Sequence, residues 1–372
     1  MNEYLRYFGY FGWLILLYLL SLRMRRWVTV KEHDDDKTVT RYNWIFALLV
    51  AAPLVYLAAT RTIYIGDTNA YKKILELAPS AWSDIPEYVN SFYKDRWFYG
   101  MTAIIKHFFG YRPVVYFAII AGIQMFLMVK TLRKYSPDFF ISMFIFVASA
   151  DYLSFMHNGV RQFLAVTLIF GAAELIFEKR YVPAIIIALI ASRFHETALL
   201  MIPFMFIVQG EPWNKSTVAV LLGSLLAVAF VGSFTEILSH MLEETNYSTI
   251  VSDWIAWNDD GTNPIRVAVY CVPSILSLIG INYIREENDP VINVCTNMSV
   301  ISAGLYIISM VTSGLYMGRL PIYVALYANC ILLPWEVEHI FNKGSSDFIR
   351  GAMIICFLLF YYYQIHSTWG VI

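Results

Sequence analysis

The chain has 372 residues, of which 58% are hydrophobic and only 15% are charged, whereas soluble globular chains carry about 25% charged residues. This composition excludes an ordinary soluble enzyme, and the formal net charge of −1 offers no electrostatic basis for binding nucleic acid. Several apolar runs approach the roughly 20 residues that a membrane-spanning helix needs. The sequence therefore predicts an all-α integral membrane protein, built as a polytopic helical bundle.

The N-terminal segment lacks a basic region and a small-residue cleavage site, so it predicts a retained first span and not a cleaved signal peptide. No Gly/Ser linker or long soluble segment interrupts the chain, and residues 1–372 are expected to form one transmembrane domain. The four cysteines lie far apart within apolar runs, which predicts free thiols and neither a disulfide framework nor a metal site: Cys271, Cys295, Cys330 and Cys356.

Hydropathy predicts about twelve spans. In chain order they are Tyr7–Leu22, Trp44–Thr60, Val114–Lys130, Phe139–Met156, Phe163–Phe177, Val182–Ser192, Thr197–Val208, Thr217–Phe234, Ile265–Ile284, Val291–Val311, Leu320–Trp335 and Ala352–Tyr363. The segment Trp97–Gly110 is shorter and is interrupted by Lys106 and His107. We interpret this segment as re-entrant or interfacial.

Basic residues orient the spans, because cytoplasmic loops are enriched in Lys and Arg. The loop after the first span is basic, with Arg23, Arg25, Arg26, Lys31, Lys37 and Arg41. If this loop is cytoplasmic, twelve crossings place most other loop cations on the same side, whereas a crossing at 97–110 would send nearly all of them outside. Both termini and the loops 61–112 and 236–263 are then extracytoplasmic.

Five arginines lie at the extracytoplasmic ends of the predicted spans, against this general bias: Arg61, Arg161, Arg193, Arg266 and Arg319. An arginine at the membrane boundary is costly unless it is paired or faces water, which makes each one a candidate functional residue. Snorkelling side chains are the alternative explanation. We favour a shared anionic ligand.

The first motif is RTIYIGDTNAY, residues 61–71. Asp67 and Thr68 suit the N-cap of a helix. Asp67 is equally suited to accept a proton or a sugar hydroxyl beside Arg61. The two interpretations are compatible, and both stay open.

The second motif, NGVRQFLA, opens a predicted span with Arg161 and Gln162 in its first turn. Unpaired N–H groups and the helix dipole at such an end, together with an arginine, suit a phosphate group. The alternative is that Asn158 caps the helix and Arg161 anchors it at the interface.

The third motif, RFHE, interrupts a long apolar run between two segments that are each short for a span. These segments are two short helices that meet outside the membrane or one broken span that lines a cavity. His195 is a natural general base for a hydroxyl group, because its ordinary pKa is about 6.5. The alternative is a packing histidine, and Glu196 either orients it or pairs with Arg193.

Two further stretches are candidate binding sites, one for sugar rings and one for a metal. Trp254 and Trp257 lie in SDWIAWNDDG and are suited to stack on sugar rings, although an ordinary interfacial aromatic belt is the more common explanation. The stretch HDDD, residues 33–36, resembles a metal cluster but lies in a polar loop, which favours a solvated charge run. No phosphate-loop, dinucleotide, zinc-protease or CxxC motif occurs, so we expect no cofactor and no metal.

These motifs, together with the later YMGRLPIYVALY (residues 316–327), occur in the order seen in the EpsG/Wzy family of bacterial polysaccharide repeat-unit polymerases, which this chain resembles. The resemblance implies a GT-C-like fold in the bacterial cytoplasmic (inner) membrane. It also implies transfer of a growing glycan from undecaprenyl diphosphate onto another lipid-linked repeat unit, at the extracytoplasmic face and without a nucleotide sugar or metal. The product would be an O-antigen, capsule or exopolysaccharide.

The resemblance assigns roles residue by residue. Arg61, Asp67, Arg161, His195 and Arg319 occupy matching motifs, whereas Arg193 and Arg266 are added from topology. We expect His195 to be the base, with Asp67 as its rival, and we expect Arg161 and Arg319 to hold the diphosphate. The remaining residues expected to bind substrate are Gln162, Tyr71, Trp254 and Trp257.

Two other functions stay open at this point. A flippase or transporter of lipid-linked glycans would also need a cationic cavity, but it should show internal repeats and polar groups reachable from both sides. A membrane acyltransferase that modifies polysaccharide is the second alternative. The expected partners are the lipid-linked donor and acceptor, and a chain-length co-polymerase and a flippase.

Overall fold

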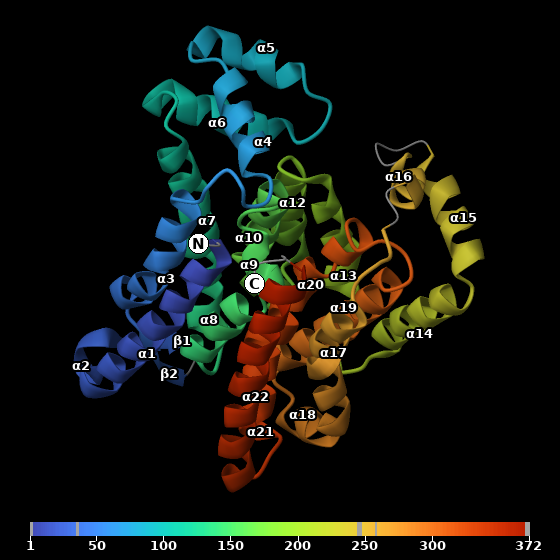
Figure 1. Ribbon diagram of the computed structural model, residues 1–372. Helices are drawn as coiled ribbons and strands as arrows, with labels where there is room; N and C mark the ends of the chain where they lie inside the picture. Colours follow the sequence, from blue (N-terminus) through green and yellow to red (C-terminus); the bar gives the residue numbers. More distant parts are fainter. Residues whose placement is uncertain (1–2, 35–36, 244–247, 257–258, 369–372) are drawn as a thin grey trace. The chain divides into compact units, whose positions relative to one another are not determined.

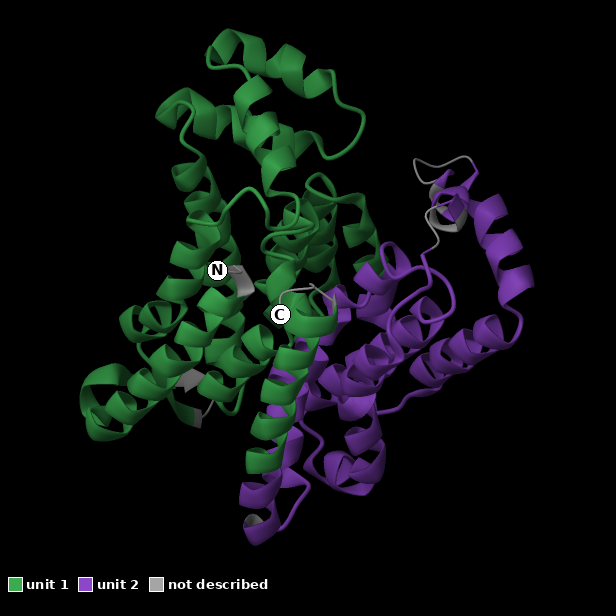
Figure 2. Ribbon diagram, viewed as in Figure 1, with its two compact units in different colours: residues 1–202, 350–372 green, residues 203–349 purple. Residues whose placement is uncertain are grey.

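A computed structural model describes residues 3–34, 37–243, 248–256 and 259–368. The chain is mainly α-helical and divides into two compact units (Figure 2). Unit 1 comprises Met1–Ile202 and Arg350–Ile372, and unit 2 comprises Pro203–Ile349. The expectation of a single membrane domain stays a prediction.

Unit 1 holds the N-terminal helices and the only β-structure in the part of the chain that the structure describes (Figure 1). Its elements are η1 (Glu3–Tyr7), α1 (Phe8–Arg23), α2 (Arg25–Val28), β1 (Thr29–Asp34), β2 (Lys37–Tyr42), α3 (Trp44–Ala59), α4 (Thr68–Leu77), η2 (Trp82–Asp84), α5 (Ile85–Asn90), α6 (Arg96–Phe109), α7 (Pro113–Tyr135), α8 (Phe139–Ala148), α9 (Asp151–Ser154), α10 (Val160–Phe170), α11 (Ala173–Phe177), α12 (Tyr181–Ser192), η3 (Glu196–Leu200) and η6 (Gln364–Thr368). Helices α3 and α10 both pack against α7.

Unit 2 is built around α19, which packs against α14, α17 and α20. Its elements are α14 (Lys215–Ala229), α15 (Val231–Leu242), α16 (Ile250–Ala256), α17 (Pro264–Ile279), α18 (Ile281–Glu287), α19 (Pro290–Ser309), η4 (Met317–Arg319), α20 (Ile322–Tyr327), the π-helix η5 (Ala328–Leu332) and α21 (Leu333–His339). Two helices cross the boundary between the units: α13 (Met201–Ile207) and α22 (Lys343–Tyr363).

Local sequence explains where many helices begin. An Asn or Asp side chain at an N-cap accepts a hydrogen bond from an otherwise unpaired backbone N–H group. Five apolar helices start in this way: α3 at Asn43, α8 at Asp138, α14 at Asn214, α17 at Asn263 and α19 at Asp289. Proline follows the cap of α19, where its missing N–H group costs nothing. Asn and Asp residues therefore set where these apolar helices begin.

The membrane-crossing potential of these helices agrees with an all-α membrane protein. Among the described residues, five helices are long and apolar enough to span: Leu5–Arg23, Pro113–Tyr135, Pro290–Ser309, Met317–His339 and Gly344–Ser367. Two bent pairs, α14 with α15 and α17 with α18, raise the number to seven if each pair is one span. The predicted number of about twelve requires that five shorter apolar helices also cross, so this number stays a prediction.

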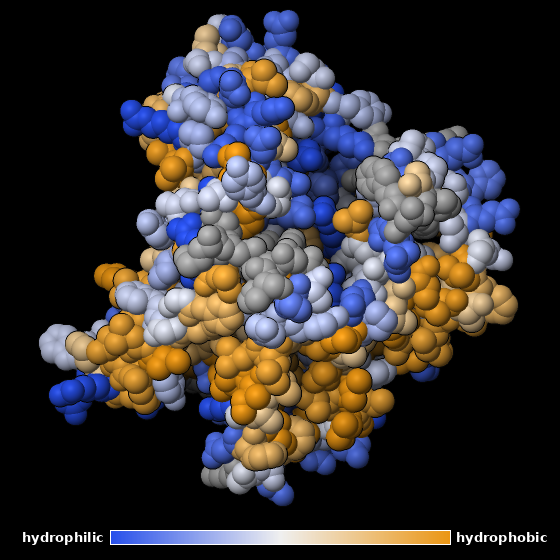
Figure 3. All heavy atoms as spheres, in the orientation of Figure 1, coloured by the Kyte–Doolittle hydropathy of each residue, from blue (hydrophilic) through white to orange (hydrophobic). Residues whose placement is uncertain are grey.

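Helix α6 corresponds to the segment for which a re-entrant or interfacial position is predicted. It is amphipathic: Phe98, Thr102 and Ile105 are buried on one face, a spacing typical of a helix lying on a core. Tyr71 of α4 packs edge-on against Phe98 at 5.6 Å between ring centroids. Figure 3 shows hydrophilic residues over α4–α6 and hydrophobic ones over α22. These contacts favour the interfacial interpretation.

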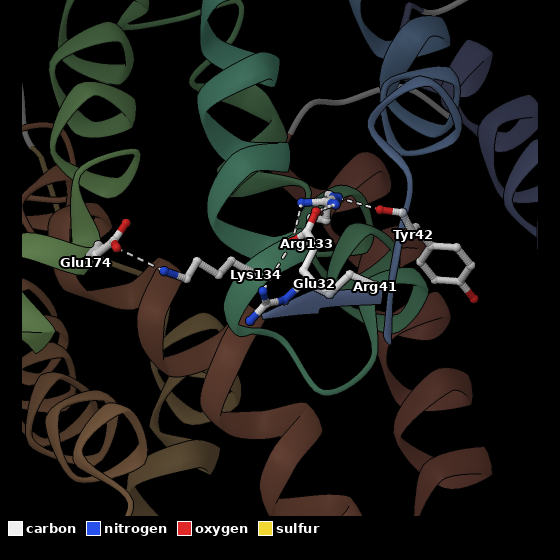
Figure 4. Close-up of polar contacts among 6 residues, drawn as sticks. All are labelled: Glu32, Arg41, Tyr42, Arg133, Lys134 and Glu174. Atoms are coloured by element: carbon white, nitrogen blue, oxygen red, sulfur yellow. Dashed lines mark hydrogen bonds and ion pairs between the residues drawn. The ribbon is translucent and has the colours of Figure 1, made fainter. Parts of the chain in front are cut away.

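Arg133, in the last turn of α7, holds the β1–β2 hairpin. Its guanidinium donates to the Glu32 carboxylate and to the Tyr42 carbonyl, and it lies 4.7 Å from the Trp44 ring centroid (Figure 4). Arg41 donates to the same carboxylate at 3.2 Å. The hydrogen bond from Arg133 holds the pKa of Glu32 below its usual value. A tertiary ion pair therefore stabilises a hairpin that would be marginal in isolation.

Candidate functional site

A buried carboxylate lies between two of the predicted site residues. Asp95 is 8% exposed, and its Oδ2 accepts a hydrogen bond from Arg161 Nη1 at 2.8 Å. Its Oδ1 lies 3.6 Å from Nδ1 of His195. Asp95 adopts a left-handed backbone conformation with φ +53° directly before α6. Such strained positions occur often at functional sites, and Asp tolerates this conformation better than most residues.

His195 lies in extended backbone between α12 and η3. Its Nδ1 is fully buried and has no hydrogen-bond partner among the described residues, whereas the side chain as a whole is 23% exposed. The exposed part of the side chain therefore belongs to atoms other than Nδ1. With its proton on Nδ1, facing Asp95, the ring presents an unprotonated Nε2 that can accept a proton. This tautomer is inferred from the position of Asp95.

Arg161 is the second residue of α10 and keeps 34% of its side chain exposed while it pairs with Asp95. The Tyr99 hydroxyl lies 3.5 Å from Nη1. Burial raises the pKa of the Tyr71 phenol, and the nearby Arg161 guanidinium opposes this rise. The partly exposed side chain lies in the first turn of α10, where the partial positive charge of the helix N-terminus also attracts anions. The group is thus both held in place and accessible.

The first two motifs meet at the start of α10. The Asp67 carboxylate, which is exposed, accepts a hydrogen bond from the Gly159 N–H at 3.4 Å. Asp67 occupies the N-cap position of α4 but its side chain makes no capping hydrogen bond there. A Cβ on Gly66 would lie 2.9 Å from the His157 carbonyl oxygen, so this turn needs glycine. The structure thus places Asp67 near Arg161.

Arg61 has a different environment. It is 5% exposed, its guanidinium donates to the Met156 carbonyl and lies 3.7 Å from the Phe117 ring centroid. His157, 3.4 Å away, is fully buried and contacts the Tyr7 hydroxyl at 2.7 Å. Burial, aided by the Arg61 charge, holds the pKa of His157 well below its usual value. These contacts favour a packing role for Arg61 and make His157 an unsuitable base.

The other predicted residues of unit 1 fall into two groups. Tyr71 and Gln162 are 3% and 4% exposed, so both lie under the site and not at its surface. The Arg193 side chain is exposed, and its backbone carbonyl accepts a hydrogen bond from the Trp97 N–H at 3.2 Å. The Trp97 and Phe194 rings pack edge-on at 6.0 Å. The start of α6 is therefore attached directly to the RFHE motif.

Unit 2 holds Arg266, in the first turn of α17, and Arg319, in η4, and both are half-buried. Asp259 organises the loop before η4 by accepting hydrogen bonds from Ser313 Oγ and from the Gly314 and Leu315 N–H groups. Although burial opposes the change, these hydrogen bonds hold the pKa of Asp259 below its usual value. The prediction for Trp257 lies outside the described residues, as does the side chain of Trp254.

Tight packing joins the loops that carry these two arginines. A Cβ on Gly261, whose φ is +86°, would lie 2.5 Å from the Met310 carbonyl oxygen. A Cβ on Gly318 would lie 2.5 Å from Thr262 Oγ1. Glycine at both positions therefore allows the two loops to approach this closely.

Sequence reasoning missed Asp95. It lies in the stretch YKDRW, whose charges have no periodicity that distinguishes one of them. The left-handed conformation and the contacts with two distant motifs appear only in the fold. Within the described ranges, no group of three or more His, Cys, Asp or Glu side chains has the geometry of a metal site.

Comparisons with known proteins give one match. Residues 44–370 match the profile of the EpsG family. No curated protein and no solved structure matches the chain. The matched region covers most of the chain and includes every residue of the Asp95 site. The chain is a member of the EpsG family, and thus a membrane protein of polysaccharide biosynthesis.

Proposed function

We propose that the protein is a polymerase that joins undecaprenyl-diphosphate-linked oligosaccharide repeat units at the extracytoplasmic face of the bacterial cytoplasmic membrane. Family membership supports a polysaccharide polymerase-type enzyme in general. The observation that carries the finer proposal is the Asp95–Arg161–His195 arrangement, which provides a base and an accessible cation within one site. Glycosyl transfer from a lipid diphosphate needs both.

The reaction forms one glycosidic bond and breaks one bond to phosphate. A hydroxyl oxygen of the acceptor glycan attacks the anomeric carbon of the donor glycan, and the bond from that carbon to the diphosphate oxygen breaks. The hydroxyl proton passes to Nε2 of His195, and the bonding electrons leave with undecaprenyl diphosphate. A positioned base contributes roughly 10²–10⁴-fold to such a step.

Negative charge develops on the departing diphosphate, and a fixed cation at that place stabilises it. The Arg161 guanidinium is suited to this role, because its planar donors match phosphate oxygens and a third of its side chain is exposed. Asp95 holds this guanidinium and faces the inner nitrogen of His195. Asp67, which meets Gly159 at the start of α10, is placed to bind an acceptor hydroxyl.

The test uses a strain that lacks the gene and expresses either wild type or His195→Ala. We expect the variant to accumulate single lipid-linked repeat units and to lose long polymer, as judged by gel analysis of extracted glycolipids. His107→Ala is the matched control, since His107 is an exposed histidine of α6 and polymer should be unchanged. Normal polymer from His195→Ala would refute the assignment of the base.

The same experiment separates the other functions. Loss of exported repeat units in a complete deletion would indicate a flippase, and full-length but unmodified polymer would indicate an acyltransferase. Either outcome would overturn the proposed polymerase activity.

A further inference from the structure

The turn after α1 presents a cluster of cations around one exposed aromatic ring. Arg23 ends α1, and Arg25 and Arg26 begin α2. All three side chains are exposed, and none of their guanidinium groups has a hydrogen bond or ion pair within the described part of the chain. Trp27 beside them is 80% exposed. We call these four residues the α2 cluster.

The α2 cluster belongs to an ordered turn. Asn43 Nδ2 donates to the Trp27 carbonyl at 2.8 Å, and the Asn43 N–H donates to the Val28 carbonyl at 2.7 Å. Asn43 also caps α3. Val28 is buried, so its side chain fixes the turn from below. The cations and the indole are thus presented by a backbone that is held at both ends.

Nearby acidic groups do not neutralise the α2 cluster. Glu32 is already paired with Arg133 and Arg41 (Figure 4). The strand register places Asp34 opposite Lys37 at the far end of the hairpin, whereas Thr29 pairs with Tyr42 at the base. Five residues of strand cover about 17 Å, which exceeds the Debye length of about 8 Å at physiological ionic strength. The backbone of Asp34 therefore lies more than a Debye length along the strand from the base of the hairpin, where the α2 cluster begins.

The α2 cluster lies at the opposite end of α1 from the Asp95 site. At the start of α1, Arg6 donates to Thr60 and Tyr7 contacts His157. Thr60 directly precedes the first motif of the site, and His157 directly precedes the second. The sixteen residues of α1 extend about 24 Å, and the segment Leu5–Arg23 is apolar enough to span a membrane. Figure 1 shows α2 and the hairpin at one end of α1, with α4–α6 beyond the other.

We propose that the α2 cluster is a binding site for anionic phospholipid headgroups in the membrane leaflet opposite the Asp95 site. Clusters of Arg and Lys directly after a membrane span attract anionic lipids, and guanidinium groups bind phosphate in a bidentate manner. Trp27 adds an exposed indole ring, and indole rings prefer the boundary between headgroups and acyl chains.

The experiment measures lipid binding to the full-length protein in detergent by native mass spectrometry. Phosphatidylglycerol and phosphatidylcholine are titrated separately against wild type and against Arg23→Gln/Arg25→Gln/Arg26→Gln. Each basic residue near the membrane surface contributes to the binding free energy for anionic lipid. Loss of all three should therefore weaken phosphatidylglycerol binding about 100-fold. Binding of phosphatidylcholine should not change.

The charge-matched control is Lys72→Gln/Lys73→Gln/Arg112→Gln, which removes three cations from α4 and the start of α7. This control should bind phosphatidylglycerol as wild type does, whereas Trp27→Ala should bind it more weakly. Unchanged binding by the arginine triple variant, or an equal loss in the control, would overturn the proposal. Inorganic phosphate is added to the wild type as a competitor. Displacement of phosphatidylglycerol by inorganic phosphate would also overturn the proposal, in favour of a free-phosphate site.

Discussion

Two arginine–carboxylate pairs occupy opposite ends of unit 1, and they differ in which partner is buried. In the pair of Arg133 with Glu32, the arginine side chain is 4% exposed and the carboxylate 33%. In the pair of Arg161 with Asp95, the arginine is 34% exposed and the carboxylate 6%. The same two chemical groups are thus arranged in reverse.

This reversal separates a structural pair from a functional one. The Arg133 guanidinium is enclosed by a carboxylate, a backbone carbonyl and an aromatic ring, so little of it can reach a ligand. Asp95, in contrast, is the enclosed partner, and it presents an accessible guanidinium and an imidazole ring to the surface. Burying the anion and exposing the cation is the arrangement that a diphosphate-binding site requires.

The largest effect should follow Asp95→Asn. Asparagine also tolerates the left-handed backbone, so the change removes charge without removing the local fold. We expect polymerisation to fall roughly 10²–10³-fold, because the base loses its positioning partner and Arg161 loses its ion pair. In vitro polymer formation from lipid-linked repeat units measures the rate, and the thermal unfolding midpoint serves as the control. An unchanged rate would show that Asp95 does not organise the site.

Arg161→Lys should have a smaller effect. Lysine retains the charge that pairs with Asp95 but lacks the planar fork that binds phosphate in a bidentate manner. Loss of one hydrogen bond to a charged group predicts a rate lower by roughly 10- to 150-fold. The same assay measures it. If Arg161→Lys matched wild type while Asp95→Asn was inactive, Arg161 would serve packing and not the diphosphate.

Arg133→Met tests whether the ion pair of Arg133 with Glu32 is structural. The free energy of unfolding should fall by about 2 kcal/mol, since hydrogen bonds to both Glu32 and the Tyr42 carbonyl are lost. Thermal unfolding in detergent measures this change. The polymerisation rate of the folded fraction should stay at the wild-type value. A large loss of rate without a loss of stability would contradict the division of roles.

The smallest effect concerns the pH dependence that Glu32 adds. Its folded-state pKa is lowered by the hydrogen bond from Arg133, so its contribution to stability is present above the unfolded value of 4.5. This contribution disappears as the pH falls through the lower, folded-state pKa. Because the carboxylate is partly exposed, we expect less than about 1 kcal/mol. The difference in unfolding midpoint between wild type and Glu32→Gln should be visible at pH 7 and should vanish in acid. A constant difference would contradict the assignment.

Much of the fold follows from local sequence. Apolar runs predict where α3, α8, α14 and α19 lie. The Asn or Asp caps found at their starts are local as well, because a cap acts within a few residues of the chain. The family was identified from short motifs for the same reason. The number of membrane crossings is harder to predict from the sequence. Short apolar helices such as α12 carry no signal that distinguishes a span from a packed segment.

For the candidate site, the sequence by itself determined that Arg161 and His195 are unusual, because ionisable residues at the ends of apolar runs are costly without a role. Only the tertiary structure decided that Asp95 joins them, that Asp67 reaches Gly159 and that Arg61 is buried against Met156. These contacts link residues 66 to 100 positions apart in the chain. Their energies depend on distance and burial, and no local pattern of residues encodes either.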